Sequence, residues 1–332
     1  MGIWYNNSQL LSYNAILNFI IGNRGGGKSY NAKDWCIRDF IKNGNQFVYV
    51  RRYKTELKKI DKFFDDIKED YPNNKLEVKG KVALIDGKVA GYFIALSTSK
   101  QEKSTAYPRV TKIIFDEFLI DKGSLHYLPN EVETFLDLFE TIARSRDNVR
   151  ALFIANAIST INPYFTYFKI RVKPTDKFIK AKDGLIVVEQ YKSQEFIEKK
   201  KNTRFGKLIE GTKYGNYAIE NEYLRDNNSF ILPKKPSRSF FMYSFKIDGK
   251  EYGVYNCPDD GFYYVDKTFD PSSSRRYALT VDDFEINFLL IKSLKNRVEF
   301  KSLIFCLENG LIMFKDLECK EAIYSISGYF TN

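Results

Sequence analysis

The sequence predicts an α/β protein whose first part has a mainly parallel sheet, followed by a small linker and an α+β C-terminal part. Three observations support this prediction. Up to about residue 170, short apolar runs alternate with longer amphipathic stretches, as in βαβ units. A glycine-rich loop stands between one such run and a helical pattern. From Phe230 onward the pattern changes to short strands and turns.

The elements follow from these patterns in chain order. Apolar runs predict strands in the first part at Ala15–Ile21, Gln46–Val50, Tyr92–Ser97, Ile113–Phe115 and Ala151–Ala155. Amphipathic stretches predict helices at Ser29–Lys42, Glu131–Arg144, Ser193–Thr203, Asp282–Leu294 and Leu317–Ser325. Two runs around an Asp248-Gly249 turn predict a hairpin of Phe240–Ile247 and Glu251–Asn256, with a further strand at Gly261–Val265. We therefore divide the chain into domains at 1–192, 193–227 and 228–332.

Composition excludes several classes of protein. Of the 332 residues, 44% are hydrophobic and 16% aromatic, which is enough for packed cores and excludes disorder. The single histidine, His126, excludes a multi-histidine metal centre and argues against a Ser-His-Asp site. The four cysteines form no CxxC pair, which argues against zinc ribbons and favours a reducing, intracellular compartment. No apolar run approaches the ~20 residues of a membrane span, so we expect no membrane partner.

Charge is unevenly distributed along the chain. The formal net charge of +10 suggests a polyanionic partner, although a plain solvated surface is an equal explanation. Residues 1–170 carry 25 basic and 19 acidic groups, and residues 171–227 carry 13 and 9. Residues 228–332 carry 14 of each. We therefore expect contacts with a polyanion in the first two segments.

A phosphate-binding loop follows the first predicted strand. The motif GxxxxGK[ST] is matched at every fixed position by Gly22, Asn23, Arg24, Gly25, Gly26, Gly27, Lys28 and Ser29. Glycines let backbone N–H groups face a phosphate, Lys28 reaches the β- and γ-phosphates, and the Ser29 hydroxyl ligates Mg²⁺. We assign these residues and the adjoining Tyr30 to ATP binding. The alternative is a glycine-rich turn that binds nothing.

Two acidic residues, Asp116 and Glu117, directly follow the predicted strand Ile113–Phe115. Asp116 is expected to hold Mg²⁺ together with Ser29, and Glu117 to orient and polarise the attacking water. Glu117 beside a magnesium-binding aspartate favours hydrolysis over phosphoryl transfer to a small molecule. The DxxG and NKxD patterns of GTPases do not occur in a suitable place. By itself, a strand that ends in two exposed acids is also compatible with a purely structural role.

Further polar residues follow other strands of the first part. Asn156 ends the strand Ala151–Ala155 and is expected to lie next to the γ-phosphate, although it could simply end a strand in a turn. Arg146, with Arg144 as second choice, is our candidate for neutralising transition-state charge from a neighbouring subunit. A cation that favours a helix C-terminus is the alternative. Lys54, after the strand Gln46–Val50, could reach a neighbour's nucleotide or belong to a solvated charge run.

Lysines in the loop after Tyr92–Ser97 are candidates for DNA contact. Lys100 and Lys103 lie in a polar stretch that suits a phosphate backbone, with an ordinary exposed loop equally compatible. A second basic cluster, Lys199–Lys201 with Arg204 and Lys207, fits one face of a solvated helix slightly better.

Several segments together resemble the DNA-packaging ATPases of phi29-like bacteriophages. They run in that family's order: Leu11–Tyr13 with the glycine-rich loop, Phe47–Lys54, Phe115–Phe118, Asn156-Ala157 with Asn162–Phe165, and Thr203–Lys207. Segments such as RRYK and TRFGK are not general features of phosphate-loop proteins. The resemblance covers the first two thirds of the chain well and is looser beyond Phe230.

The resemblance implies both a fold and a function. The family consists of an ASCE-type ATPase domain, a short linker and an RNase H-like C-terminal domain without nuclease activity. Its members form a homomeric ring, usually pentameric, on the portal vertex of a prohead in the host cytoplasm. There they drive double-stranded DNA inward with Mg²⁺ and ATP. In the family, the residues matching Arg146 and Lys54 act or are proposed to act in trans. Relatives also use a structural RNA, and the residues here leave that requirement open.

Two rival functions are also compatible with the sequence. A packaging protein could retain metal-dependent nuclease activity in its last domain, since Asp266, Asp270, Asp282 and Asp283 could converge, whereas Asp248 lies in the predicted hairpin turn. Solvated loop acids are the better interpretation of these residues. A nucleotide-gated structural adaptor of the capsid is the second rival.

Overall fold

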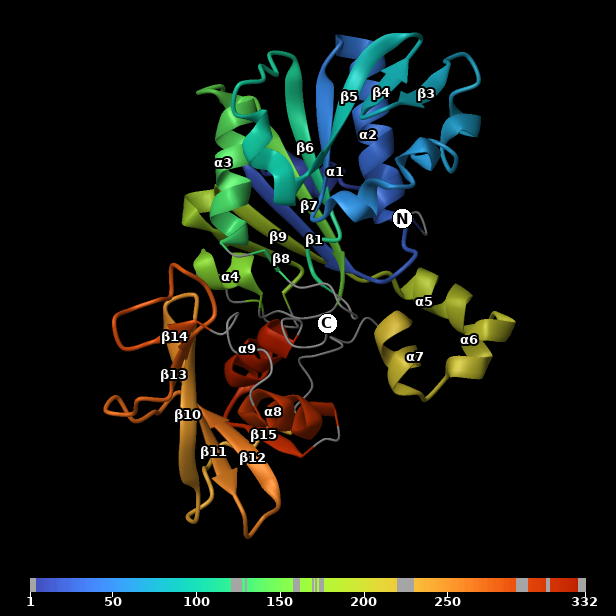
Figure 1. Ribbon diagram of the computed structural model, residues 1–332. Helices are drawn as coiled ribbons and strands as arrows, with labels where there is room; N and C mark the ends of the chain where they lie inside the picture. Colours follow the sequence, from blue (N-terminus) through green and yellow to red (C-terminus); the bar gives the residue numbers. More distant parts are fainter. Residues whose placement is uncertain are drawn as a thin grey trace. The chain divides into compact units, whose positions relative to one another are not determined.

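The computed structural model of the chain divides into two compact units (Figure 1). One unit contains residues 1–121 and 131–224, and the other contains 122–130 and 225–332. The structure describes residues 4–120, 127–128, 130–157, 162–168, 170, 172, 176–219, 230–290, 298–308 and 311–327. Residues 193–224 of the predicted linker are grouped with the first unit, and residues 225–227 with the second. Within the described residues, no helix is long and apolar enough to cross a membrane.

A mixed, mainly parallel sheet forms the centre of the first unit. Nine strands of the described residues run in the order β3-β4-β5-β2-β6-β7-β1-β9-β8. Their bounds are β1 Leu17–Gly22, β2 Gln46–Arg51, β3 Leu76–Lys79, β4 Val82–Ile85, β5 Lys88–Ala95, β6 Val110–Asp116, β7 Arg150–Asn156, β8 Phe178–Ala181 and β9 Ile186–Tyr191. The strands from β5 to β9 in this order pair in parallel, and β3, β4 and β8 add antiparallel edges. The predicted α/β class is confirmed.

Strand β7 lies between β1 and β6 and determines which loops meet. Its register pairs Asn156 with Gly22 and Ile154 with Asp116. Because the three strands are parallel, their carboxyl ends lie at one edge of the sheet. The glycine-rich loop, the acidic pair and Asn156 therefore come together, although they are far apart in the sequence.

The helices of the first unit begin and end at recognisable signals. Helix α2, Lys28–Asn43, begins after Gly27 and ends at Gly44, both of which have positive φ angles. The Gly44 N–H donates to the carbonyl of Phe40, which closes the last turn. The remaining helices in this region are α1 Ser8–Ser12, α3 Glu131–Ala143 and α4 Pro163–Tyr167, with 3₁₀ helices η1 Lys54–Leu57, η2 Ile60–Lys62, η3 Lys68–Asp70, η4 Leu96–Glu102 and η5 Lys182–Gly184.

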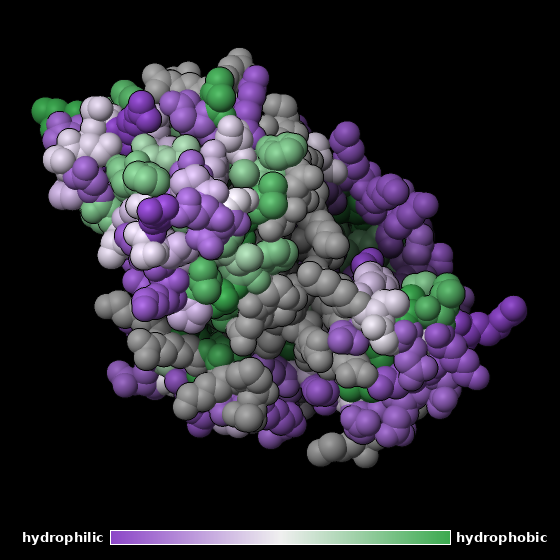
Figure 2. All heavy atoms as spheres, turned by 90° about the horizontal axis from the view of Figure 1, so that it is seen from below, coloured by the Kyte–Doolittle hydropathy of each residue, from purple (hydrophilic) through white to green (hydrophobic). Residues whose placement is uncertain are grey.

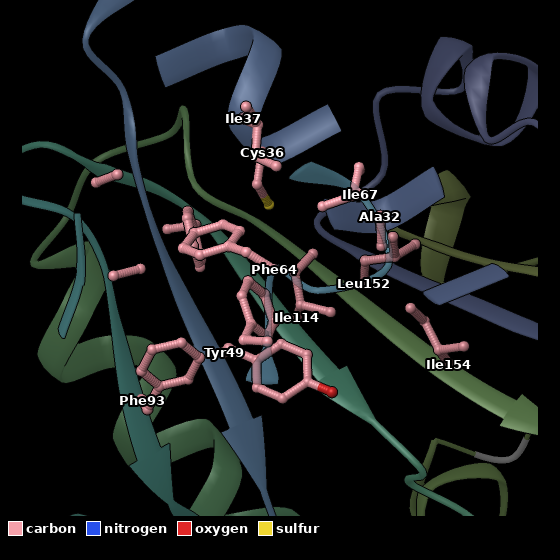
Figure 3. Packing of buried hydrophobic residues seen from close by; sticks show 14 of the residues in the cluster. Ala32, Cys36, Ile37, Tyr49, Phe64, Ile67, Phe93, Ile114, Leu152 and Ile154 are labelled. Carbon is pink, nitrogen blue, oxygen red and sulfur yellow. The ribbon is translucent and has the colours of Figure 1, made fainter. Parts of the chain in front are cut away.

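Buried side chains of α2 and the strands form the core of one face of this sheet. Cys36 and Ile37 of α2 pack toward Ile114 and Leu152 of the central strands (Figure 3). Tyr49 of β2 has its ring in the same cluster, where Phe93 packs edge-on to it at 6.0 Å between ring centroids. This core fixes α2 on the sheet and so fixes the loop that precedes it.

Three short helices follow β9 and form the linker part of the first unit. They are α5 Gln194–Lys201, α6 Arg204–Ile209 and α7 Lys213–Ala218. The hydroxyls of Thr203 and Thr212 accept hydrogen bonds from the N–H groups of Gly206 and Gly215, respectively, and cap α6 and α7. A Cβ at either glycine would lie within about 2.1 Å of the preceding helix's last carbonyls. The pattern Thr-x-x-Gly therefore builds the same close joint twice.

The second unit contains a six-stranded mixed sheet. Its order is β14-β13-β10-β11-β12-β15, in which β10, β11 and β12 are antiparallel and the other pairs parallel. The elements are β10 Phe240–Ile247, β11 Lys250–Cys257, β12 Phe262–Asp266, β13 Arg276–Ala278, β14 Leu289–Leu290 and β15 Ile312–Phe314, with α8 Val298–Glu308 and α9 Leu317–Ser327. The predicted α+β class with an RNase H-like strand arrangement is confirmed.

A helix predicted in the second unit differs from the structure. The helix expected at Asp282–Leu294 is absent over residues 282–290, where turns and the short strand β14 occur instead. Side chains that a helix would have buried remain in solvent, because Ile286 is 94% exposed and Phe284 is 46% exposed. Residues 291–294 lie outside the described part of the chain.

Candidate nucleotide site

A pocket of about 260 Å³ lies at the carboxyl ends of β1, β6 and β7. Its walls come from the glycine-rich loop, the start of α2 and the carboxyl ends of β6 and β7. The lining residues are Gly25, Gly26, Gly27, Lys28, Ser29, Tyr30, Asp116, Glu117, Ile154, Ala155 and Asn156. The loop, the acidic pair and Asn156, which were selected separately from the sequence, therefore share one cavity.

The glycine-rich loop owes its shape to close backbone contacts. A Cβ at Gly22 would lie 2.5 Å from the Tyr191 carbonyl oxygen, and one at Gly26 would lie 2.7 Å from the Tyr191 ring. Gly27 has φ +88°, which L side chains rarely adopt. The Gly26 carbonyl accepts a hydrogen bond of 2.9 Å from the Tyr5 N–H. With a carbonyl thus turned outward, the curved loop can present N–H groups to an anion.

Lys28 is drawn back into the loop. Its ammonium donates to the carbonyls of Gly22 and Asn23 at 3.0 and 2.6 Å, and lies 3.5 Å from Oδ1 of Asn156. The side chain is almost fully buried, and this desolvation lowers its pKa from 10.5 to about 7, against an opposing effect from Asp116. A buried amine held by neutral carbonyls has an unmet need for negative charge, which a phosphate can supply.

Ser29 and Asp116 provide oxygen ligands suited to Mg²⁺. The Ser29 hydroxyl donates to Oδ1 of Asp116 at 3.1 Å, and the Tyr49 hydroxyl donates to Oδ2 at 2.7 Å. A hydroxyl and a carboxylate are hard donors of the kind that Mg²⁺ prefers, and Mg²⁺ usually keeps several waters and takes its other ligands from phosphates. The pair fits such an ion. Tyr49 fixes the carboxylate from the side of the core.

Glu117 has a strained backbone and an occupied carboxylate. Its φ angle is +58°, and its N–H donates to Oδ1 of Asp116. The side chain is 59% exposed and its Oε2 lies 2.5 Å from the Arg51 guanidinium, which also binds Glu56. A non-glycine residue in the left-handed region next to a reaction centre is typical of sites that aim a side chain.

A buried ion pair holds the backbone at Glu117 and Phe118 in place. Arg52 forms a two-pronged contact with Glu131, at 2.7 and 2.9 Å, and both side chains are almost fully buried. The same guanidinium donates to the carbonyls of Glu117 and Phe118. Sequence reasoning missed this pair. The available signal was a second arginine directly after a buried strand.

Some predicted nucleotide-binding residues lie beside the pocket and do not line it. Gly22 and Asn23 form the entry to the loop, and the Asn23 side chain donates to the Ile219 carbonyl at 2.6 Å, away from the cavity. Arg24 is exposed on the outer turn. Lys54 is exposed at the start of η1, after the carboxyl end of β2. It is at the same sheet edge as the pocket but is not among the lining residues.

Arg146 lies at the opposite edge of the sheet. Its guanidinium donates to the carbonyls of Ile142 and Ala143 at the end of α3, and to those of Tyr107 and Pro108 just before β6. This is the amino end of the parallel strands, whereas the pocket is at their carboxyl ends. Arg146 therefore has no place in the pocket of its own chain. Arg144 is exposed, with φ +43°, and donates to the Thr105 carbonyl.

The predicted DNA-contacting lysines are in or beside a short helix. Lys100 is exposed in η4, and Lys103 follows it and pairs with Asp137 of α3 at 3.2 Å. Both positions of this ion pair are well exposed, so it contributes little to stability. The stretch expected as a polar loop thus has local helical structure and packs against α3. The other basic cluster lies on α5 and α6, where hydrophilic surface dominates at the right of the view in Figure 2.

The acids of the second unit are mostly occupied by internal partners. Asp266 binds Lys315 at 2.7 Å, and Asp283 accepts hydrogen bonds from Gly249 and Thr280. Asp248 is exposed in the hairpin turn, and desolvation of its carboxyl together with the Asp283 charge raises its pKa to about 6. No cluster of three metal-binding side chains occurs within the described ranges of the chain. His126 lies outside those ranges.

Comparison with known proteins identifies the family. The family model described as "Podovirus DNA encapsidation protein (Gp16)" matches residues 1–329. The chain belongs to the Gp16 family. This Gp16 protein is 40% identical over 324 residues to the DNA packaging protein of Bacillus phage phi29, an alignment covering 98% of this chain and 97% of the relative. The DNA packaging protein of Bacillus phage PZA is 41% identical over the same length.

Solved structures agree with this assignment. In the bacteriophage phi29 viral genome packaging motor assembly, a chain 38% identical superimposes with a TM-score of 0.67, covering 99% of this Gp16 protein and 100% of that chain. The crystal structure of the N-terminal domain of the phi29 DNA packaging ATPase is 45% identical, with a TM-score of 0.55. The superposition covers 59% of this chain and 100% of the phi29 domain. The resemblance to phi29-like packaging proteins is confirmed.

Proposed function

We propose that this Gp16 protein is an ATP-hydrolysing translocase that packages double-stranded viral DNA into a preformed prohead. It would act as a homomeric ring, usually a pentamer in the family, on the portal, in the host cytoplasm. The observation that carries the proposal is the shared pocket in which Lys28, Asp116 and Glu117 meet. The relatives' description as DNA packaging proteins supports the same activity.

The pocket residues divide the work of hydrolysis. The loop N–H groups would bind the phosphates of ATP, and Lys28 would turn from the carbonyls of Gly22 and Asn23 to the β- and γ-phosphates. Ser29 and Asp116 would hold Mg²⁺, which neutralises phosphate charge when bound. Glu117 would leave Arg51, accept a hydrogen bond from the attacking water and take its proton. Asn156 would contact the γ-phosphate from β7.

A neighbouring subunit would complete the site. The position of Arg146, at the far edge of the sheet from its own pocket, supports action in trans. Its guanidinium would neutralise charge that develops as the γ-phosphoryl group leaves. Lys54, exposed beside the pocket edge, would contribute a second cation across the same boundary.

Double-stranded DNA and the portal are the proposed partners. Lys100 and Lys103 would contact the phosphate backbone, since both ammonium groups are exposed and neither is deeply paired. A structural RNA remains a further possible partner that no residue here identifies.

Two substitutions test the proposal. Lys28→Ala should abolish ATP turnover, because the phosphates lose their buried cation. Glu117→Gln should still bind ATP but trap it, because an amide cannot take the water's proton. If ATP turnover persists in either variant, the assignment of the site is wrong. Measuring the ATPase rate with and without double-stranded DNA, across salt concentrations, tests the DNA track.

The two rivals make different predictions. A retained nuclease would cut plasmid in the presence of Mg²⁺ or Mn²⁺. The internal pairing of Asp266 with Lys315 disfavours such a metal site. A nucleotide-gated adaptor that does not move DNA would show no stimulation of ATPase activity by DNA.

A further inference from the structure

The glycine-rich loop is bonded on its outer side to the linker helices. The Asn23 side chain donates to the Ile219 carbonyl at 2.6 Å. Lys200, at the end of α5, donates to the Arg24 carbonyl at 3.1 Å and to the Ala218 carbonyl at 2.9 Å. Two side chains thus tie successive loop residues to the end of α7. None of these five residues lines the pocket.

The contact between Asn23 and Ile219 is sheltered from solvent, whereas the contact between Lys200 and Arg24 is exposed. Asn23 is fully buried, and Ala218 and Ile219 are each 1% exposed. The Oδ1 atom of Asn23 has no hydrogen-bond partner among the described residues. An amide held in this way costs free energy, so its retention requires the Nδ2 contact to Ile219. Hydrogen bonds in such a site weaken when either partner moves by a small distance.

The charge of Lys200 also lies close to the loop. Its ammonium binds the Arg24 carbonyl at 3.1 Å, and burial together with the Arg24 charge lowers its pKa. An anion bound by the loop would be attracted to this ammonium.

We propose that Lys200 and Asn23 are positioning residues that couple occupancy of the phosphate loop to the end of helix α7. The inference rests on the proposed nucleotide site and specifies how that site is regulated. Phosphate binding draws the Arg24 and Asn23 backbone toward the ligand, and the two side chains transmit this displacement to Ala218 and Ile219. From there the chain continues into the second unit. Nucleotide state thus reaches the start of that connection by direct contacts.

Hydrogen–deuterium exchange of the full-length protein tests the coupling. Addition of MgADP should slow exchange across Lys213–Ala218 in the wild type. Lys200→Met, which keeps the side chain's length but removes its donors, should lose most of that slowing and weaken MgADP binding about fivefold. Lys200→Arg should restore the response. Lys207→Met, an exposed charge lost on neighbouring α6, is the matched control and should behave as wild type.

The outcomes separate a coupling role from a purely structural one. A structural role would alter exchange across α7 equally with and without MgADP, whereas coupling changes the difference between the two states. Asn23→Ala provides a second, independent variant with the same expected loss. A wild type that binds MgADP without any response across α7 overturns the coupling alone. A wild type that binds no MgADP contradicts the proposed function as well.

Discussion

The carboxylate of Glu117 lies 2.5 Å from the guanidinium of Arg51, at the mouth of the pocket. A second carboxylate, Glu56, binds the same guanidinium at 2.9 Å and keeps it in place. Glu117 must therefore leave this contact before it can act on a water molecule. Because its side chain is 59% exposed, the ion pair holds it by at most about 1 kcal/mol.

Removing the restraint should accelerate hydrolysis. In Arg51→Met, Glu117 is free to face the pocket, so kcat without DNA should rise by up to about fivefold. Steady-state ATPase assays measure this, with Arg38→Met as a control, since Arg38 is an exposed arginine paired with Asp34 on α2. A fall in kcat would instead mean that Arg51 assists the reaction directly.

Nucleotide binding should take up a proton above neutral pH. In the empty site the pKa of Lys28 is lowered to about 7 by burial, and a bound phosphate restores the charged form. Below pH 7 the amine is protonated in both states, so affinity is steady. Above it, the free protein has lost the proton, and affinity should fall by up to ~10-fold per pH unit.

Calorimetry at pH 8 in buffers of different ionisation enthalpy would reveal this proton. The observed binding enthalpy should vary with the buffer at pH 8 and vary less at pH 6, after allowance for the nucleotide's own titration. Equal enthalpies in all buffers at pH 8 would show that Lys28 is already charged in the empty site.

Breaking the buried ion pair should destabilise the first unit. Glu131→Gln leaves the Arg52 charge buried without its counter-charge, and the expected cost is about 3–5 kcal/mol in the free energy of unfolding. Urea unfolding followed by tryptophan fluorescence measures it, because Trp4 and Trp35 both belong to this unit. Replacing both partners with methionine should cost less than the single change. A Glu131→Gln variant within about 1 kcal/mol of wild type would show that the pair adds nothing.

Mixed rings should reveal whether Arg146 acts across a boundary. Wild-type subunits mixed with Arg146→Ala should lose ATPase activity faster than in proportion to the mutant fraction, because each mutant subunit impairs its neighbour's site. Arg38→Ala is the control, as Arg38 is an exposed arginine that pairs with Asp34 on α2. Each Arg146→Ala subunit should also be slightly less stable, since four carbonyls lose their donor. A strictly proportional loss of activity would mean that every site is self-contained.

The sequence predicted the pocket better than it predicted what holds the pocket in place. Strand periodicity placed Lys28, Asp116 and Asn156 at strand ends, and parallel pairing brings such ends to one edge. Which strands are neighbours cannot be read from a local pattern, so the position of β7 between β1 and β6 needed the structure. The burial of Arg52 could not be predicted for the same reason, because its partner Glu131 lies on α3, far away in the sequence.

Local patterns were misleading where the chain has no regular period. The stretch from Asp282 had enough apolar residues to suggest a helix, yet Phe284 and Ile286 are exposed and the backbone turns. Conversely, α6 and α7 were not anticipated, because helices of six residues are too short for a hydrophobic period. Their signal is the repeated Thr-x-x-Gly, which specifies a cap and a close contact.

Those two joints have a mechanical consequence. A glycine at which any Cβ would collide with the previous helix's carbonyls, with a threonine cap at the same turn, leaves few soft torsions between consecutive helices. The linker should therefore have low elastic compliance despite its small core. A force applied at one end of the linker would be transmitted to its other end with little bending of the linker.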